Sequence, residues 1–214
     1  MSIVVTGASR GIGAGLAAHY RIAGETVVAT ARDDSADVAL DVAKPAEFAN
    51  LSQHLGGAPV DLLICNAGVY LDKAAHLEHG YDAALWAQTF AVNVTGVFLT
   101  VQTLLNNLRS AQNPKIAIIS SQMASQENAP GGSYIYRASK AAALNLGRNL
   151  AVDLQGDGIA VGIYHPGWVR TDMGGGAADI STEDAVTGLV TEFETLNLET
   201  TGCFRTWDGR DHPF

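Results

Sequence analysis

Residues 6–13 read Thr6-Gly7-Ala8-Ser9-Arg10-Gly11-Ile12-Gly13, a glycine-rich turn that follows an aliphatic run and opens a helix-like segment. Glycines let a backbone turn tightly and approach a pyrophosphate, while a helix N-terminus offers unpaired N–H groups and the positive end of a dipole. A helix entry that is rich in glycine by chance is the alternative. The position of the turn directly after a first strand favours a dinucleotide site.

On either side of this turn, short aliphatic runs alternate with longer segments rich in Ala and Leu. The predicted strands are 3–6, 26–31, 38–42, 60–65, 116–120, 159–164 and 203–207, and the predicted helices are 11–23, 45–55, 83–110, 134–154 and 182–196. The strands lack polar alternation, which is typical of a parallel sheet covered on both faces. We therefore predict one α/β domain over residues 1–214, with a doubly wound, seven-stranded parallel sheet. Residues 32–36 are too few for the usual crossover helix, which we expect to be missing.

The composition limits the partners and the compartment. Thirteen Lys and Arg against 22 Asp and Glu give a net charge of -9, which disfavours nucleic acid and anionic membranes as partners. Cys65 and Cys203 are too few for a disulfide scaffold, so a reducing compartment fits best. The first predicted strand begins at Ile3, which leaves no room for a signal peptide, and we find no apolar stretch of 18 residues. We expect a cytoplasmic protein.

The end of the second predicted strand bears on the choice of nucleotide. An acid there would bind the adenosine ribose and favour NAD, but the strand ends at Arg32. Arg32 and Arg10 could together clamp a 2'-phosphate, because a guanidinium makes charge-assisted, often bidentate bonds to phosphate oxygens. Alternatively both are solvated surface charges, and Asp33 and Asp34 would weaken the site. We favour NADP(H), with NAD(H) possible.

Three further segments carry candidate catalytic groups. Tyr136 and Lys140 lie four residues apart and hence on one face of a helix, where the ammonium would lower the pKa of the phenol. Ser120 and Ser121 end the fifth strand, at the sheet edge where ligands bind. Asn93 is a polar residue in an apolar run. The alternatives are a surface Tyr–Lys pair, a strand-capping Ser121 and an Asn93 that satisfies a helix irregularity.

Six motifs occur in the order typical of the short-chain dehydrogenase/reductase family, and together they cover essentially the whole chain. They are the turn at 6–13, Cys65-Asn66-Ala67-Gly68, Asn93, Ser120-Ser121, Tyr136-Arg137-Ala138-Ser139-Lys140 and Pro166-Gly167-Trp168-Val169-Arg170-Thr171. The chain most resembles a branch of small carbonyl reductases that also includes the C-signal type of bacterial cell-contact protein. The resemblance implies a Rossmann fold and a reversible, NADPH-dependent reduction of a ketone or aldehyde.

The resemblance also implies roles for individual residues. Tyr136 would protonate the carbonyl oxygen during hydride transfer, Ser121 would hold that oxygen, Lys140 would bind the nicotinamide ribose and tune Tyr136, and Asn93 would anchor a water. Residues that would contact the cofactor are Gly7, Ser9, Arg10, Gly11, Ile12 and Gly13 at the phosphates and adenosine, Asp41 and Val42 at the adenine, Asn66, Ala67 and Gly68 at the ribose, and Pro166, Gly167, Val169 and Thr171 at the carboxamide. This chemistry needs no metal.

The chain departs from the family pattern in the spacing of its catalytic residues. The family commonly places its serine thirteen residues before the tyrosine, which from Ser121 gives Tyr134. We choose Tyr136, because residue 138 is an alanine and Tyr134 would lack its lysine. Two extra residues then fall in the loop 122–133, next to the substrate site.

The residues predicted near the substrate are mostly apolar or aromatic, which suits an apolar carbonyl compound, although ordinary loop packing explains them equally well. They are Tyr70, Gln122, Met123, Tyr134, Trp168 and Met173. A signalling or regulatory protein that binds the cofactor with little turnover is the second hypothesis. From the family resemblance we expect a homodimer or homotetramer through the two longest helices.

Overall fold

The computed structural model describes every residue from Met1 to Phe214, and its centre is a seven-stranded sheet in which all strands are parallel. The strand order is β3-β2-β1-β4-β5-β6-β7. The strands are β1 Ser2–Val5, β2 Thr26–Ala31, β3 Val38–Ala39, β4 Leu62–Cys65, β5 Lys115–Ile119, β6 Ala160–His165 and β7 Phe204–Thr206. The predicted doubly wound parallel sheet is confirmed.

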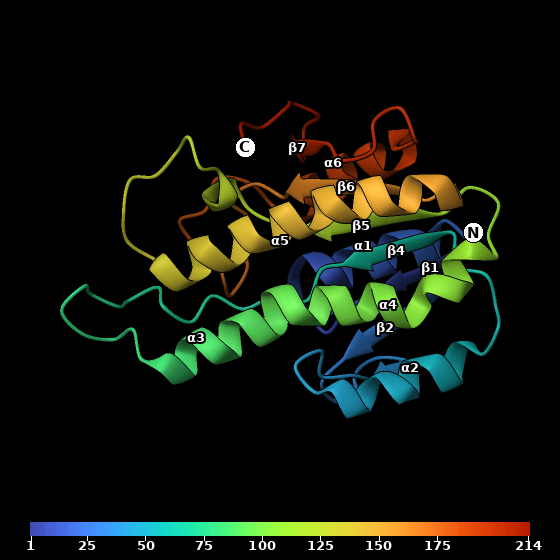
Figure 1. Cartoon of the computed structure of the whole chain (residues 1–214), viewed down its shortest axis with the longest axis horizontal. Helices are drawn as coiled ribbons and strands as arrows, with labels where there is room; N and C mark the ends of the chain where they lie inside the picture. The colour runs from blue at the N-terminus through green and yellow to red at the C-terminus, as the bar shows by residue number, and fades with distance from the viewer.

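Helices cover both faces of this sheet (Figure 1). They are α1 Gly11–Ile22, α2 Phe48–Leu55, α3 Ala83–Phe90, α4 Gly96–Arg109, α5 Tyr134–Leu154 and α6 Thr182–Thr195. The predicted helix 83–110 is interrupted by a π-helical turn at Ala91–Thr95, which separates α3 from α4. The last helix is capped by Ser181, whose hydroxyl accepts the Asp184 N–H.

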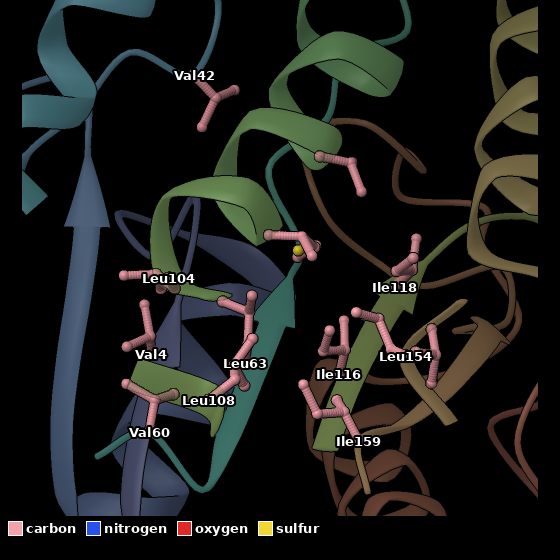
Figure 2. Packing of buried hydrophobic residues seen from close by; sticks show 14 of the residues in the cluster. Val4, Val42, Val60, Leu63, Leu104, Leu108, Ile116, Ile118, Leu154 and Ile159 are labelled. Atoms are coloured by element: carbon pink, nitrogen blue, oxygen red, sulfur yellow. The ribbon is translucent and has the colours of Figure 1, made fainter. Parts of the chain in front are cut away.

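Side chains of each central strand alternate between two cores. Val4 and Leu63 lie in the larger cluster, which fills the space between the sheet and helices α2, α4 and α5 (Figure 2). Ile3 and Ile64 belong to a second cluster, which packs against α1 and α6. All four are fully or almost fully buried, which explains why the strands show no alternation of polar and apolar residues.

The connection from β2 to β3 contains no helix, as predicted. Strand β3 is only two residues long, against the predicted 38–42, and pairs with the last two residues of β2, Thr30 and Ala31. The connecting loop is too short to return the chain to the start of β2, so the two strands share only their C-terminal ends. Asp37 ties this loop down by accepting the Ala29 N–H at 2.7 Å and pairing with Arg21.

The helical segment Ala83–Arg109 is long and apolar enough, by length and composition, to cross a membrane. The segment is apolar on average, but polar residues such as Asn93 and Gln102 interrupt it, so it contains no unbroken apolar stretch of 18 residues. Part of the segment is buried against the sheet, and Leu104 and Leu108 belong to the core shown in Figure 2.

Candidate active site

A cleft of about 440 Å³ opens at the carboxyl ends of the strands, where an open parallel sheet binds its ligands. The predicted residues that line it are Gly7, Ser9, Arg10, Gly11, Ile12, Gly13, Arg32, Asp41, Val42, Asn66, Ala67, Gly68, Tyr136, Lys140, Pro166 and Thr171. Gly167 and Val169 lie beside the cleft and not among its lining residues. Gly167 packs closely against Ile180 and Trp207, and Val169 is buried and pairs with Ile180.

The glycine turn is held against the segment after β4. Gly7 has a φ of +67°, and a Cβ there would lie 2.7 Å from the Ala67 Cα. The Asn66 side-chain amide donates to the carbonyls of Thr6 and Gly7, at 3.0 Å each, and would collide with a Cβ on Gly13. This close approach brings the N-terminus of α1 into the cleft.

The first N–H groups of α1 are available to a ligand. Arg10 occupies the cap position of α1 in an extended conformation and makes no side-chain cap bond. Because the first turn of a helix has no internal partners for its N–H groups, the wall at Gly11 and Ile12 can bind an anion. These features fit the pyrophosphate of a dinucleotide.

Tyr136 lies in the first turn of α5 with its ring inside the site. It is 7% exposed and stacks on the ring of Tyr70, with centroids 4.2 Å apart and an interplanar angle of 21°. Burial raises the pKa of the phenol to about 12, while a hydrogen bond with Ser121 opposes this rise. At neutral pH the phenol therefore keeps its proton and can act as an acid.

Lys140 lies one turn further along α5 and is buried. Its ammonium donates to the Ile119 carbonyl at 2.9 Å and lies 5.8 Å from the centroid of the Tyr136 ring. Desolvation lowers the pKa of Lys140 to about 8, so it still carries its proton at neutral pH. A cation at this distance favours a phenolate on Tyr136.

Asn93 occupies the π-helical turn between α3 and α4, and its side chain is fully hydrogen-bonded. Its oxygen accepts the Val69 N–H, and its amide donates to the Val69 carbonyl and to the Ser139 hydroxyl, each at 2.9 Å. Asn93 thus joins the segment after β4 to helix α5. Asn93 therefore lies in a helix irregularity, as the alternative interpretation expected. It also lies against α5, the helix that carries Tyr136 and Lys140.

The two serines at the end of β5 have different partners. The Ser120 hydroxyl donates to the backbone carbonyl of Lys140 at 3.1 Å. The Ser121 hydroxyl accepts the Met123 N–H at 3.1 Å and hydrogen-bonds with Tyr136. Ser121 is therefore the serine whose hydroxyl lies with the phenol.

The two candidate tyrosines have different surroundings in the structure. Tyr134 is 39% exposed and places its ring edge-on to Tyr81, whereas Tyr136 lines the cleft beside Lys140. The loop that contains the two extra residues ends with Ser133 in a left-handed conformation, directly before α5.

The rim of the cleft consists of Arg10, Arg32 and Asp172, all three exposed. Arg10 pairs with Asp172 at 2.7 Å, an ion pair between the glycine turn and the loop after β6. The carboxylate of Asp33 accepts bonds from the backbone and hydroxyl of Ser35 in its own loop. Asp33 therefore hydrogen-bonds within its own loop, next to Arg32, whose 2'-phosphate site it was expected to weaken.

Some residues that line the cleft were not predicted from the sequence as cofactor contacts. They are Ala31, Leu40, Val69, Val92, Ile119, Ser120, Arg170, Asp172, Met173 and Thr182. Some had a usable signal, since Asp172 directly follows the motif 166–171. Leu40 and Val92 had none, because an aliphatic side chain in a cleft looks like any core residue.

Comparisons with known proteins agree with this geometry. The family model described as short chain dehydrogenase matches residues 1–180. The chain belongs to the short-chain dehydrogenase/reductase family. It is thus an oxidoreductase of this family, as its motifs predicted.

Individual members of the family show how far the likeness extends. C-signal of Myxococcus xanthus is 38% identical over 157 residues, which cover 73% of this chain and 93% of that protein. The 1-hydroxy-2-glutathionyl-2-methyl-3-butene dehydrogenase of Rhodococcus sp. is 32% identical over 225 residues, covering 97% of each chain. The NADPH-bound carbonyl reductase from chicken fatty liver superposes with a TM-score of 0.91 at 28% identity, covering 100% of this chain and 98% of that one.

Proposed function

We propose that this short-chain dehydrogenase/reductase is an NADPH-dependent carbonyl reductase, which reduces a ketone or aldehyde to an alcohol and also runs in reverse. The observation that carries the proposal is the convergence of the Tyr136 phenol and the Lys140 ammonium in a buried part of the cleft, with the Ser121 hydroxyl hydrogen-bonded to the phenol. The likeness to the chicken carbonyl reductase supports it.

In the reduction, Tyr136 donates its proton to the carbonyl oxygen and Ser121 donates a hydrogen bond to the same oxygen. The nicotinamide ring supplies the hydride when the cofactor is bound. Lys140 stabilises the phenolate that remains on Tyr136 and would also hold the cofactor ribose. The water that Asn93 is expected to anchor would contact the main chain of Asn93, because the side-chain amide already has its hydrogen-bond partners.

The predicted cofactor residues would hold the dinucleotide along the cleft, from the glycine turn to Pro166 and Thr171. Arg32 and Arg10 would bind the 2'-phosphate that distinguishes NADPH from NADH. Gly167 and Val169 would act through the shape of the loop after β6, since both are packed away from the cleft.

The substrate that we propose is an uncharged, largely apolar carbonyl compound. Tyr70 and Met123 adjoin Tyr136 and Ser121, and Trp168 and Met173 expose apolar surface on the loop after β6. The Rhodococcus relative is named as a dehydrogenase of a glutathionyl alcohol, which is consistent with a reversible reaction.

A second function, cofactor binding for signalling with little turnover, is favoured by the likeness to C-signal. One experiment separates the two: tryptophan-fluorescence titration with NADPH and NADH, followed by turnover on a panel of ketones and aldehydes. We expect turnover, and tighter binding of NADPH. The preference for NADPH over NADH should fall about tenfold in Arg32→Ala, because the variant loses one charge-assisted contact to the phosphate. Binding of NADPH without turnover of any carbonyl compound would support the second function.

We further propose a homodimer or homotetramer through α4 and α5, and a cytoplasmic location. Phe98 on α4 and Val152 on α5 expose apolar surface that a second copy would cover. Size-exclusion chromatography with light scattering tests the assembly, and a monomer would contradict it.

A further inference from the structure

Asp72 is a buried carboxylate that the proposed mechanism leaves without a role. It is 1% exposed and lies in the segment after β4. Its oxygens accept the N–H groups of Ile135 at 2.9 Å and of Tyr136 at 3.2 and 3.3 Å. These are the N–H groups of the second and third residues of α5, and they have no partners within the helix.

The residue that would ordinarily cap this helix cannot do so. Ser133 has left-handed backbone angles, with φ 47° and ψ 43°, and its side chain makes no cap bond. Its hydroxyl instead hydrogen-bonds with the Tyr70 hydroxyl at 2.5 Å. A left-handed conformation is unfavourable for a residue other than glycine. The cap of α5 therefore comes from Asp72, more than sixty residues earlier in the chain.

The segment 69–72 touches two of the proposed catalytic residues, Asn93 and Tyr136, at three points. Val69 is hydrogen-bonded through both its N–H and its carbonyl to Asn93. Tyr70 stacks on the Tyr136 ring, and Asp72 holds the Tyr136 backbone. The position of Tyr136 thus depends on this segment as well as on its own helix.

We propose that Asp72 is a positioning residue for Tyr136, which fixes the start of α5 through two backbone N–H groups and places a negative charge next to the phenol. The proposal rests on the proposed role of Tyr136 as the acid. A carboxylate at a helix N-terminus is stabilised by the helix dipole and by charge-assisted hydrogen bonds, which offset the free-energy cost of burying it.

The charge of Asp72 acts on Tyr136 together with three other groups. Tyr70, which stacks on the ring, and Asp72 both favour the protonated phenol, whereas Ser121 stabilises the phenolate by hydrogen bonding. Lys140, on the next turn of α5, favours the phenolate as a cation. Removing the charge of Asp72 while keeping its shape should therefore lower the pKa of Tyr136.

The test compares Asp72→Asn and Asp72→Ala with a matched control, Asp82→Asn. Asp82 caps helix α3 by accepting the Leu85 N–H at 2.9 Å, and it is exposed. Asp72→Ala should lower kcat about a hundredfold, because the phenol is no longer held in place, and Asp72→Asn should restore most of that loss. Asp82→Asn should match the wild type. The affinity for NADPH should stay within about twofold in all three, since Asp72 does not line the cleft.

Two further measurements exclude a merely structural role. In alcohol oxidation the rate rises with pH as Tyr136 loses its proton. This rise should move about one pH unit lower in Asp72→Asn, because the variant lacks a negative charge that opposes ionisation of the phenol. Hydrogen exchange should accelerate at the Ile135 and Tyr136 amides in Asp72→Ala and remain unchanged at Leu144 in the middle of α5.

The outcomes separate this proposal from the proposed function. A wild type with turnover, together with an unmoved pH profile in Asp72→Asn and unchanged exchange in Asp72→Ala, overturns the role of Asp72 alone. A wild type without turnover overturns the proposed function, and the exchange rates then decide whether Asp72 caps α5. If Asp72→Ala does not fold, the pH profile and exchange rates of Asp72→Asn decide.

Discussion

The proposed catalytic cluster, Asn93, Ser121, Tyr136 and Lys140, contrasts with the rim of the cleft, Arg10, Arg32 and Asp172. All four members of the cluster are buried, and each has a hydrogen-bond partner on another segment of the chain. The rim residues are exposed, and their one ion pair joins side chains that are 71% and 73% exposed.

The difference follows from the elements that carry the two groups. Tyr136 and Lys140 belong to the 21-residue helix α5, which packs on the sheet, and Asn93 lies in the long helical segment beside it. Arg32 begins the short loop that replaces a crossover helix. Substitutions in the cluster should therefore have large effects on turnover or stability, and substitutions at the rim small effects on affinity.

The largest effect is expected for Tyr136→Phe. Removing the phenolic hydroxyl leaves the ring stacked on Tyr70 but takes away the proton donor, so kcat should fall about 10²- to 10⁴-fold. The affinity for NADPH should remain within about twofold. Steady-state kinetics and fluorescence titration measure the two quantities separately.

The matched control is Tyr134→Phe, the same substitution on the exposed tyrosine that begins α5, two residues before Tyr136. It should leave kcat close to the wild-type value. If instead Tyr134→Phe abolished turnover and Tyr136→Phe did not, the catalytic cluster would be wrongly assigned.

A smaller effect is expected for the pH dependence of stability at Lys140. Its pKa is about 8 in the folded chain, against the ordinary lysine value of 10.5. Between these values unfolding takes up a proton, so the free energy of unfolding of the wild type should rise with pH relative to Lys140→Met. The relative gain should be about 2 kcal/mol between about pH 7 and pH 9.5.

Urea unfolding of the cofactor-free protein measures this difference. Tyr136 contributes little in this range, because the pKa of the phenol is 10.0 in the unfolded chain, the ordinary tyrosine value, and about 12 in the folded chain. Arg10→Met, which removes an exposed rim cation, should show the wild-type pH dependence. Equal pH dependence in Lys140→Met and the wild type would mean that the buried ammonium keeps its usual pKa.

The elements with strong local patterns were predictable from the sequence. The β-branched run 26–31 forms β2, and the predicted helix 134–154 is α5, each without a change of boundary. The predicted strand 38–42 shortened to Val38–Ala39, because its length depends on how far the loop before it can reach and not on its own residues.

The candidate site divides in the same way. The spacing of Tyr136 and Lys140 is local and could be recognised, and so could the glycine turn. The cap from Asp72 to α5 and the bond from Arg10 to Asp172 join residues far apart in the sequence. No local pattern marks such partners, because they are set by the packing of α5 and of the loop after β6 on the sheet.

The smallest effect is expected at the rim, where Asp172 competes with the cofactor for Arg10. The two side chains pair at 2.7 Å, and a cofactor phosphate that binds Arg10 must displace or share this carboxylate. An exposed ion pair stabilises the fold by about 1 kcal/mol or less, so its loss should not measurably change the unfolding free energy.

Asp172→Asn should therefore lower the Kd for NADPH about two- to fivefold at low salt, because it removes both a competitor for Arg10 and a negative charge near the phosphates. The gain should shrink as salt is raised, since an interaction between exposed charges is screened. Asp179→Asn makes the same charge change on the same loop, at an exposed residue outside the cleft lining, and should bring a smaller gain. Weaker binding in Asp172→Asn would reverse this interpretation: the ion pair would then hold the two walls of the cleft together around the cofactor, and the rim would contribute to the site as the catalytic cluster does.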